Sequence, residues 1–184
     1  MPDKNSINKK AVMIVAYENF RDEEYLTPKK ILKERGVEVK TASNKIGKAK
    51  GTGGVEAEVD LLVKDIHPDD FDAVIFIGGQ GALENLDNQI SYNLARTAVE
   101  KRKILAAICV SPVILAKAGA LKGRQATVWS SLVEQRPVKV LEANGAKYQN
   151  KAVVVDGKII TADGPAAAQE FGEKIRESLS TTYP

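Results

Sequence analysis

Residues 104–115, ILAAICVSPVIL, decide how the chain around them is organised. The stretch begins as a continuous apolar run over 104–108, which is typical of a strand buried on both faces. Ser111 and Pro112 then mark a helix start, because Ser is a good N-cap and Pro is favoured at the first helical position. The stretch therefore predicts a buried strand, a sharp turn that carries Cys109, and a helix.

Cys109 is the only cysteine of the chain. Unpaired backbone N–H groups at a helix start favour a negative charge, and such a position lowers a cysteine pKa from about 8.5 to between roughly 3.5 and 7.5. A lone cysteine after an apolar strand is also often just a small hydrophobe in the core. The sequence alone leaves both interpretations open, a reactive thiol and an inert core residue.

The composition predicts one soluble, cytoplasmic domain. A chain of 184 residues is long enough for one sizeable core and short for two domains. Its 27 Lys and Arg are interspersed with 24 Asp and Glu, so no basic stripe indicates a nucleic-acid partner. One cysteine excludes an internal disulfide and fits a reducing compartment. The polar start 1–9, expected to be a disordered tail, lacks the apolar core of a signal peptide, and no apolar run approaches the ~20 residues of a membrane span.

Apolar periodicity and turn residues predict alternating strands and helices. We expect buried strands over 11–16, 37–42, 71–77 and 104–108. We expect helices over 23–35, 88–102 (capped from Asp87), 112–118, 132–144 and 165–180. Residues 17–22 are expected to form a loop, 55–63 a small hairpin or an edge strand, and 125–129 a short strand. Two β-branched runs around Asp156-Gly157 predict a hairpin over 152–162. This order predicts a three-layer α/β/α sandwich with a mostly parallel central sheet.

Several polar residues follow the predicted strands and should share one edge of the sheet, because ligands of open parallel sheets bind at the carboxyl ends of the strands. Cys109 follows 104–108, and Gly78-Gly79 follows 71–77. The acidic residues that follow 11–16 are Glu18, Asp22, Glu23 and Glu24. His67, the only histidine, precedes 71–77 and is expected at the opposite edge. A Cys–His dyad within one chain is therefore not expected.

These residue types suit chemistry at a thiol, although each also has a simpler explanation. A protonated, partly buried carboxyl can donate a hydrogen bond to a thiolate, whereas glutamates at a helix start also simply favour the helix dipole. Gly78-Gly79 could place a backbone N–H beside that of Val110 as an oxyanion site, or could form a tight turn that needs a positive φ. GGQGALE lacks the third glycine of a dinucleotide fingerprint and follows the wrong strand, so nucleotide binding is not expected.

Four motifs in this order resemble the ThiJ/PfpI superfamily, which includes deglycases and intracellular proteases. They are FRDEEYLTP at 20–28, IGGQGA at 77–82, AAICVSPVILAKAGALKGRQAT at 106–127 and TADGPAAAQEFG at 161–172. The resemblance covers nearly the whole chain. It implies a flavodoxin-like fold similar to class I glutamine amidotransferases, one domain over 1–184, and a homo-oligomer, a dimer or larger.

The resemblance also implies roles for individual residues. Cys109 would be the nucleophile, and Glu24, selected over Glu23 by its spacing to Pro28, would be the protonated partner and proton shuttle. The backbone N–H groups of Gly79 and Val110 would form the oxyanion hole. The other residues expected to line the site are Gly78, Ser111, Trp129, Gly164 and Pro165. No metal ion or organic cofactor is implied.

Three activities follow as hypotheses. The first is a cysteine-dependent glyoxalase or deglycase that acts on small α-oxoaldehydes or their adducts. The alternative is a redox-sensing stress-response or chaperone-like protein whose cysteine is oxidised to a sulfenic or sulfinic acid. An intracellular peptidase is the least favoured, because Val110 stands where the protease-like members have a histidine, and the general base is then missing. No membrane or nucleic-acid partner is expected.

Overall fold

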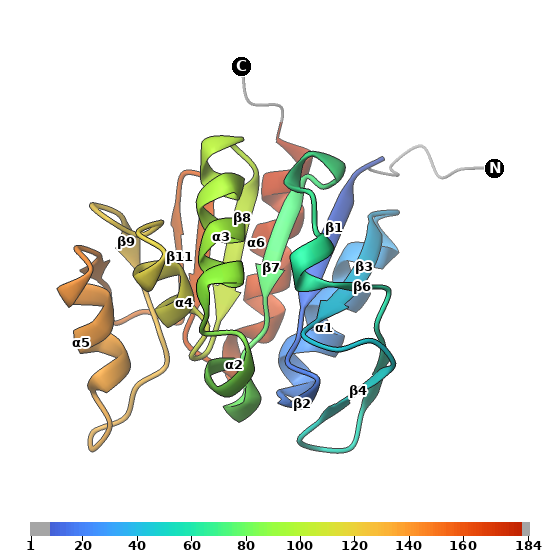
Figure 1. Ribbon diagram of the computed structural model, residues 1–184. Helices are drawn as coiled ribbons and strands as arrows, with labels where there is room; N and C mark the ends of the chain where they lie inside the picture. The colour runs from blue at the N-terminus through green and yellow to red at the C-terminus, as the bar shows by residue number, and fades with distance from the viewer. Residues whose placement is uncertain (1–7, 182–184) are drawn as a thin grey trace.

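The computed structural model describes residues 8–181, so residues 1–7 of the predicted tail lie outside the described residues. Within this range the main sheet is seven-stranded, in the order β11-β12-β8-β7-β1-β3-β6 (Figure 1). All neighbouring strands in it are parallel except β11 and β12, which form the predicted hairpin. The strands are β1 (Lys10–Ile14), β3 (Glu38–Ser43), β6 (Leu61–Leu62), β7 (Ala73–Phe76), β8 (Ile104–Ile108), β11 (Val153–Asp156) and β12 (Ile159–Ala162).

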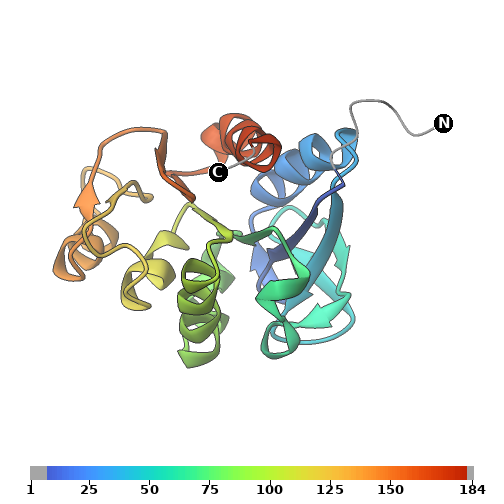
Figure 2. The same ribbon diagram turned by 90° about the horizontal axis from the view of Figure 1, so that it is seen from above.

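Helices cover both faces of this sheet, which confirms the predicted sandwich. Viewed from above, α1 (Asp22–Glu34) and α6 (Ala168–Ser180) lie side by side on one face, and α3 (Gln89–Glu100) and α4 (Pro112–Lys117) lie on the other (Figure 2). Alternate residues of each central strand join one of two buried clusters. In β8, for example, Leu105 packs toward α3 and α4, and Ala106 packs toward α1 and α6. The strand run is apolar throughout because both faces are covered.

The remaining helices partly differ from the sequence-based prediction. A short helix, α2 (Gln80–Asn85), starts within the glycine loop, where no helix was predicted. Asn88, rather than Asp87, caps α3, because its side chain accepts the N–H groups of Ile90 and Ser91. The helix predicted over 132–144 is shorter: α5 spans Arg136–Ala143. The short 3-10 turns are η1 (Val63–Asp65), η2 (Pro68–Asp70) and η3 (Pro165–Ala167).

Two small sheets replace segments that were predicted as a loop or a single strand. The predicted loop 17–22 contains β2 (Glu18–Phe20), which pairs with β4 (Lys48–Gly51), and β4 pairs antiparallel with β5 (Glu56–Glu58). The predicted strand 125–129 is only β9 (Gln125–Ala126), which pairs with β10 (Lys147–Tyr148) outside the main sheet. Short polar strands of this kind carry too few apolar residues to show a period of two.

The helices of the part of the chain that the structure describes are all too short or too polar to cross a membrane.

Candidate active site

Cys109 occupies a strained turn at the carboxyl end of β8. Its φ of 63° lies in the left-handed region, which is uncommon for a residue other than glycine. Hydrogen bonds on both sides hold this conformation: the Cys109 N–H donates to Ala162 O (2.9 Å), and Trp129 N–H donates to Cys109 O (2.8 Å). The turn lifts the thiol out of the strand, where it is partly exposed. Backbone strain of this type costs of order 1–3 kcal/mol and is concentrated at functional sites.

Glu24 is the acidic residue that reaches the thiol. It lies in the first turn of α1 and is 0% exposed. Its Oε2 accepts a hydrogen bond from the Gly78 N–H (3.1 Å), while Oε1 is buried and has no hydrogen-bond partner of ordinary geometry within residues 8–181. Four residues later Pro28, which lacks an N–H, cannot donate to the Glu24 carbonyl, so one hydrogen bond of the helical series is absent beside the site.

The glycine loop after β7 allows this close approach. A Cβ on Gly78 would lie 2.5 Å from the Cys109 Cβ and 2.6 Å from Glu24 Oε2, so a larger residue would push the pair apart. Gly79 has a φ of 106°, and a Cβ there would lie 2.5 Å from Asn19 O. Gly81 similarly packs onto the Glu18 carbonyl. Gly79 thus has the positive φ that a tight turn needs, and Gly78 provides the space in which Glu24 approaches Cys109.

The thiol and the carboxyl strongly influence each other's titration. Burial raises the pKa of Glu24 from 4.5 to about 7, although the Cys109 thiol and the Gly78 N–H oppose the shift. Burial, followed by the charge of Glu24, raises the pKa of Cys109 to about 12. Of the two interpretations that the sequence left open, this direction does not favour a lowered cysteine pKa, because removal of the sulfur from water outweighs the N–H groups around it. Burial thus disfavours the charged form of both groups, and of the two Glu24 has the pKa nearer to neutral pH.

Two backbone N–H groups face the sulfur. Those of Gly79 and Val110 both interact with the Cys109 side chain and act to lower its pKa. Donors at this position would also meet the oxygen of a carbonyl group whose carbon bonds to the sulfur. The arrangement therefore brings together a thiol, a carboxyl group and two backbone N–H donors, which are the groups that addition of a cysteine to a carbonyl would need.

The other predicted site residues divide into two groups. Trp129 and Gly164 adjoin the nucleophile: the Trp129 N–H binds Cys109 O, and a Cβ on Gly164 would lie 3.7 Å from Trp129 Cδ1. Pro165 begins η3 directly after them. Ser111 does not act on the thiol, because its buried hydroxyl donates to Ile77 O (2.8 Å) and ties the helix start to β7. It makes no side-chain cap of α4 either.

The remaining acidic residues and the histidine have other positions. Glu18 and Glu23 are exposed, and Glu23 pairs with Arg21. His67 precedes η2, at the amino end of β7, so it lies at the opposite edge of the sheet as predicted.

The sequence did not predict the structural role of Asp22, whose side chain packs the end of β4 against the start of α1. Its buried carboxylate lies against Gly51 and Gly53, where a Cβ would collide with it. Its Oδ1 has no hydrogen-bond partner among the residues that the structure describes. The glycines of the run GTGG at 51–54 leave room for this side chain, and the contact holds β4 beside the start of α1.

A metal site is not formed by the described residues, since no three His, Cys, Asp or Glu side chains in 8–181 group in a way that could hold an ion.

The sequence motifs, the sheet order and the site geometry agree with one family model, that of the DJ-1/PfpI family, which matches residues 9–178. The chain belongs to the DJ-1/PfpI family. The match extends from β1 into α6 and therefore includes every element that holds Cys109 and Glu24. The predicted family membership is confirmed.

Relatives of this DJ-1/PfpI protein cover nearly its full length. An uncharacterized protein of Methanocaldococcus jannaschii is 36% identical, over 96% of this chain and 85% of its own. A deglycase of Thermococcus kodakarensis is 35% identical, over 90% of this chain and 99% of its own. The crystal structure of a ThiJ/PfpI domain protein from Brachyspira murdochii superimposes with a TM-score of 0.89 at 30% identity, over 96% of this chain and 99% of that one.

Proposed function

We propose that the protein is a cysteine-dependent enzyme of the glyoxalase or deglycase type, which converts small α-oxoaldehydes, or their early adducts, into hydroxy acids. The observation that supports this most is the direct pairing of the Cys109 thiol with a carboxyl whose pKa is raised to about 7. A general acid–base group is most effective when its pKa lies near the working pH. The deglycase name of a relative at 35% identity is in keeping with the proposal.

The first step is addition of the thiol to the aldehyde. A bond forms between Sγ of Cys109 and the aldehyde carbon, and the thiol proton passes to the ionised Glu24 carboxylate. Accepting the proton removes the negative charge that helps to raise the cysteine pKa, so the transfer becomes easier as it proceeds. The aldehyde oxygen takes up negative charge against the N–H groups of Gly79 and Val110 and is then protonated by Glu24, which gives a hemithioacetal and restores the Glu24 carboxylate.

The second step moves a proton between neighbouring carbons of the substrate. Glu24 removes the proton from the former aldehyde carbon and returns one to the adjacent carbon, while the oxygens exchange a proton, so that a hydroxyacyl thioester results without net oxidation. Water then attacks the thioester carbon, the carbon–sulfur bond breaks, and the thiol regains its proton. Methylglyoxal plus water would thus leave as lactate. Each step uses Cys109, Glu24 and the two N–H groups.

The same pair argues against the two other activities. Oxidation to a sulfenic acid proceeds through the thiolate, and burial, together with the charge of Glu24, disfavours the thiolate form of Cys109. A peptidase of the Cys–His type needs an imidazole at the nucleophile, whereas Val110 follows Cys109 and His67 precedes β7 at the other edge. Redox sensing and proteolysis therefore rank below aldehyde chemistry.

The test is lactate formation from methylglyoxal by the wild type and by Cys109→Ser. We expect wild-type turnover that rises with pH through about 7, as Glu24 becomes a base, and a loss to background in the variant. Equal lactate yields from both proteins would refute the proposal. Intact mass after mild peroxide treatment separates the redox alternative, which requires addition of one or two oxygens at Cys109 without aldehyde turnover.

A further inference from the structure

A cavity begins at Val110, the residue after Cys109. Its volume is about 340 Å³. Elements distant in sequence meet around it: α2, the start of α4, the segment before α5, and α5 itself. We call it the Val110 cavity and define it by its apolar walls, Leu83, Val110, Val113, Trp129, Pro137 and Val140.

Two residues connect the Val110 cavity to the reacting sulfur, which does not itself line it. Val110 uses its backbone N–H at the Cys109 sulfur and its side chain in the cavity wall. Trp129 donates its N–H to Cys109 O (2.8 Å) and also lines the wall. Val110 and Trp129 are therefore shared between the surroundings of the Cys109 thiol and the wall of the Val110 cavity.

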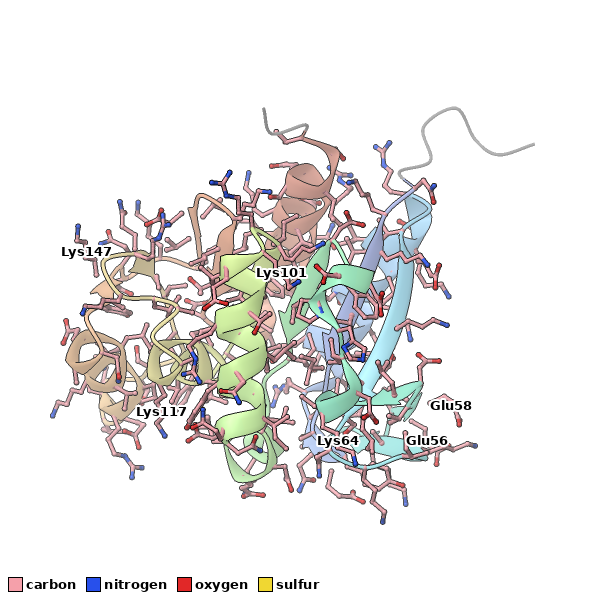
Figure 3. The ribbon with its side chains drawn as sticks, turned by 45° about the horizontal axis from the view of Figure 1, so that its top comes forward. Glu56, Glu58, Lys64, Lys101, Lys117 and Lys147 are labelled. Atoms are coloured by element: carbon pink, nitrogen blue, oxygen red, sulfur yellow. The ribbon has the colours of Figure 1, made fainter. Side chains whose placement is uncertain are left out.

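The charges at the rim of the Val110 cavity are already paired. Lys117, labelled in Figure 3, pairs with Asp87, and Arg136 pairs with Glu134. The hydrogen bonds from Arg136 lower the pKa of Glu134 to about 2, so that this carboxylate stays ionised. Because each cation has an anion beside it, the rim does not favour a ligand of either charge. The walls and the rim together favour a neutral, apolar group.

The volume also sets a size for that group. An apolar cavity of about 150 Å³ in another protein accommodates benzene, so 340 Å³ has room for a phenyl ring with its linking atoms. A methyl group would leave most of the space empty.

We propose that the Val110 cavity binds the side group of the substrate, and that the enzyme prefers aryl or branched-alkyl α-oxoaldehydes, such as phenylglyoxal, over methylglyoxal. The preference rests on the proposed function, because it names the substrate class for the same nucleophile. A well-filled apolar pocket discriminates by about 10- to 200-fold for even one missing methylene, so a preference of at least tenfold in kcat/KM is expected.

Turnover of both aldehydes by pocket variants tests the preference. Val140→Phe fills the Val110 cavity and should reduce kcat/KM for phenylglyoxal to mandelate at least tenfold, and it should reduce kcat/KM for methylglyoxal much less. The matched control is Val155→Phe, the same change at an exposed residue of β11 outside the cavity, which should alter neither. Val140→Ala shortens a side chain of the wall and so enlarges the Val110 cavity, which should extend the preference to naphthylglyoxal. Equal kcat/KM values for both aldehydes in the wild type, or equal losses in Val140→Phe, would overturn the inference.

A second measurement works without turnover. 2-Bromoacetophenone and bromoacetone both alkylate a thiol: a sulfur–carbon bond forms, the carbon–bromine bond breaks, and bromide and the thiol proton leave. The rate of each at Cys109, relative to a free thiol and followed by intact mass, should favour the aryl reagent about tenfold in the wild type and not in Val140→Phe. Aryl-selective labelling without any aldehyde turnover would refute the proposed function and leave the cavity inference standing. If both turnover and labelling occur without a preference for the aryl compound, the cavity inference is refuted and the proposed function stands.

Discussion

Two carboxyl groups, one at each end of the parallel strands of the central sheet, show how the surroundings of an acidic side chain set its pKa. Asp72 precedes β7 at the amino edge, where it accepts the Lys10 N–H (2.9 Å) and pairs with Lys9 (3.0 Å). Burial alone would raise the pKa of Asp72, but these donors and the charge of Lys9 bring it below its usual range. Glu24, at the carboxyl edge, has one backbone donor and no ion pair within residues 8–181, and burial raises its pKa to about 7.

The difference in pKa separates a carboxylate with a structural role from a carboxyl group that can exchange a proton near neutral pH. Asp72 stays ionised at every physiological pH and serves to join β7 to the chain start. Glu24 can gain and lose a proton near neutral pH, which is the property that proton transfer needs. Removal from water acts to raise the pKa of both carboxyl groups, and a neighbouring positive charge decides whether the net shift is upward or downward. The predictions below test that contrast.

The largest expected effect concerns catalysis. Glu24→Gln keeps an oxygen for the Gly78 N–H but cannot accept a proton, so kcat/KM for α-oxoaldehydes should fall by about 10²- to 10⁴-fold. Asp72→Asn and Glu23→Gln, the latter an exposed neighbour in the same helical turn, should stay within about twofold. Steady-state kinetics on the four proteins decides the matter. A Glu24→Gln enzyme with more than a tenth of wild-type activity would contradict the role of this carboxyl.

The next effect concerns the space between Glu24 and Cys109. Gly78→Ala places a methyl group 2.5 Å from the Cys109 Cβ, so the pair must separate. We expect about a hundredfold loss of kcat/KM, because displacements near 1 Å at reacting groups cost this much. Gly123→Ala is the control: its φ of 74° strains an alanine by about 1 kcal/mol, and nothing lies within 4 Å of its Cβ. Unchanged activity in Gly78→Ala would show that close approach is not required.

A smaller effect appears in stability against pH. Because the folded pKa of Glu24 is raised, its contribution is fully present below pH 4.5 and is lost as pH rises to about 7. The glutamine in Glu24→Gln does not titrate. The free energy of unfolding of the variant, relative to that of the wild type, should therefore increase between pH 4.5 and about 7, by about 3 kcal/mol at the upper end. Urea titrations at pH 4, 6 and 8 measure the gain. Parallel pH curves for the two proteins would argue against a raised pKa.

The smallest effect has the opposite sign. The lowered pKa of Asp72 means that its contribution is present above the unfolded value of 3.8 and is lost as pH falls through the folded value. Asp72→Asn should therefore be less stable than the wild type at pH 7, by less than about 1 kcal/mol because the pair is partly exposed, and equal to it in strong acid. A deficit that grows toward low pH would be inconsistent with this assignment.

Much of the fold follows from local patterns. The runs at 11–16, 71–77 and 104–108 predict three buried strands, and β8 matches its predicted bounds residue for residue. The structure places the three side by side in the main sheet. The segments that were mispredicted carry weak local signals. The apolar pair Leu132 and Val133 looked like part of a helix, yet both are fully exposed, and α5 begins only at Arg136.

The sequence by itself determined the strand, turn and helix around Cys109, the edge of the sheet at which Cys109, Glu24 and Gly78 meet, and the family. These depend on apolar period, turn residues and motif order, which are local properties of the chain. Only the tertiary structure decided the chemistry of the pair. A pKa is set by water exclusion and by charges across space, so neither the raised pKa of Cys109 nor that of Glu24 could be deduced from neighbours in sequence. The close approach at Gly78 and the cavity that starts at Val110 likewise arise where distant segments pack.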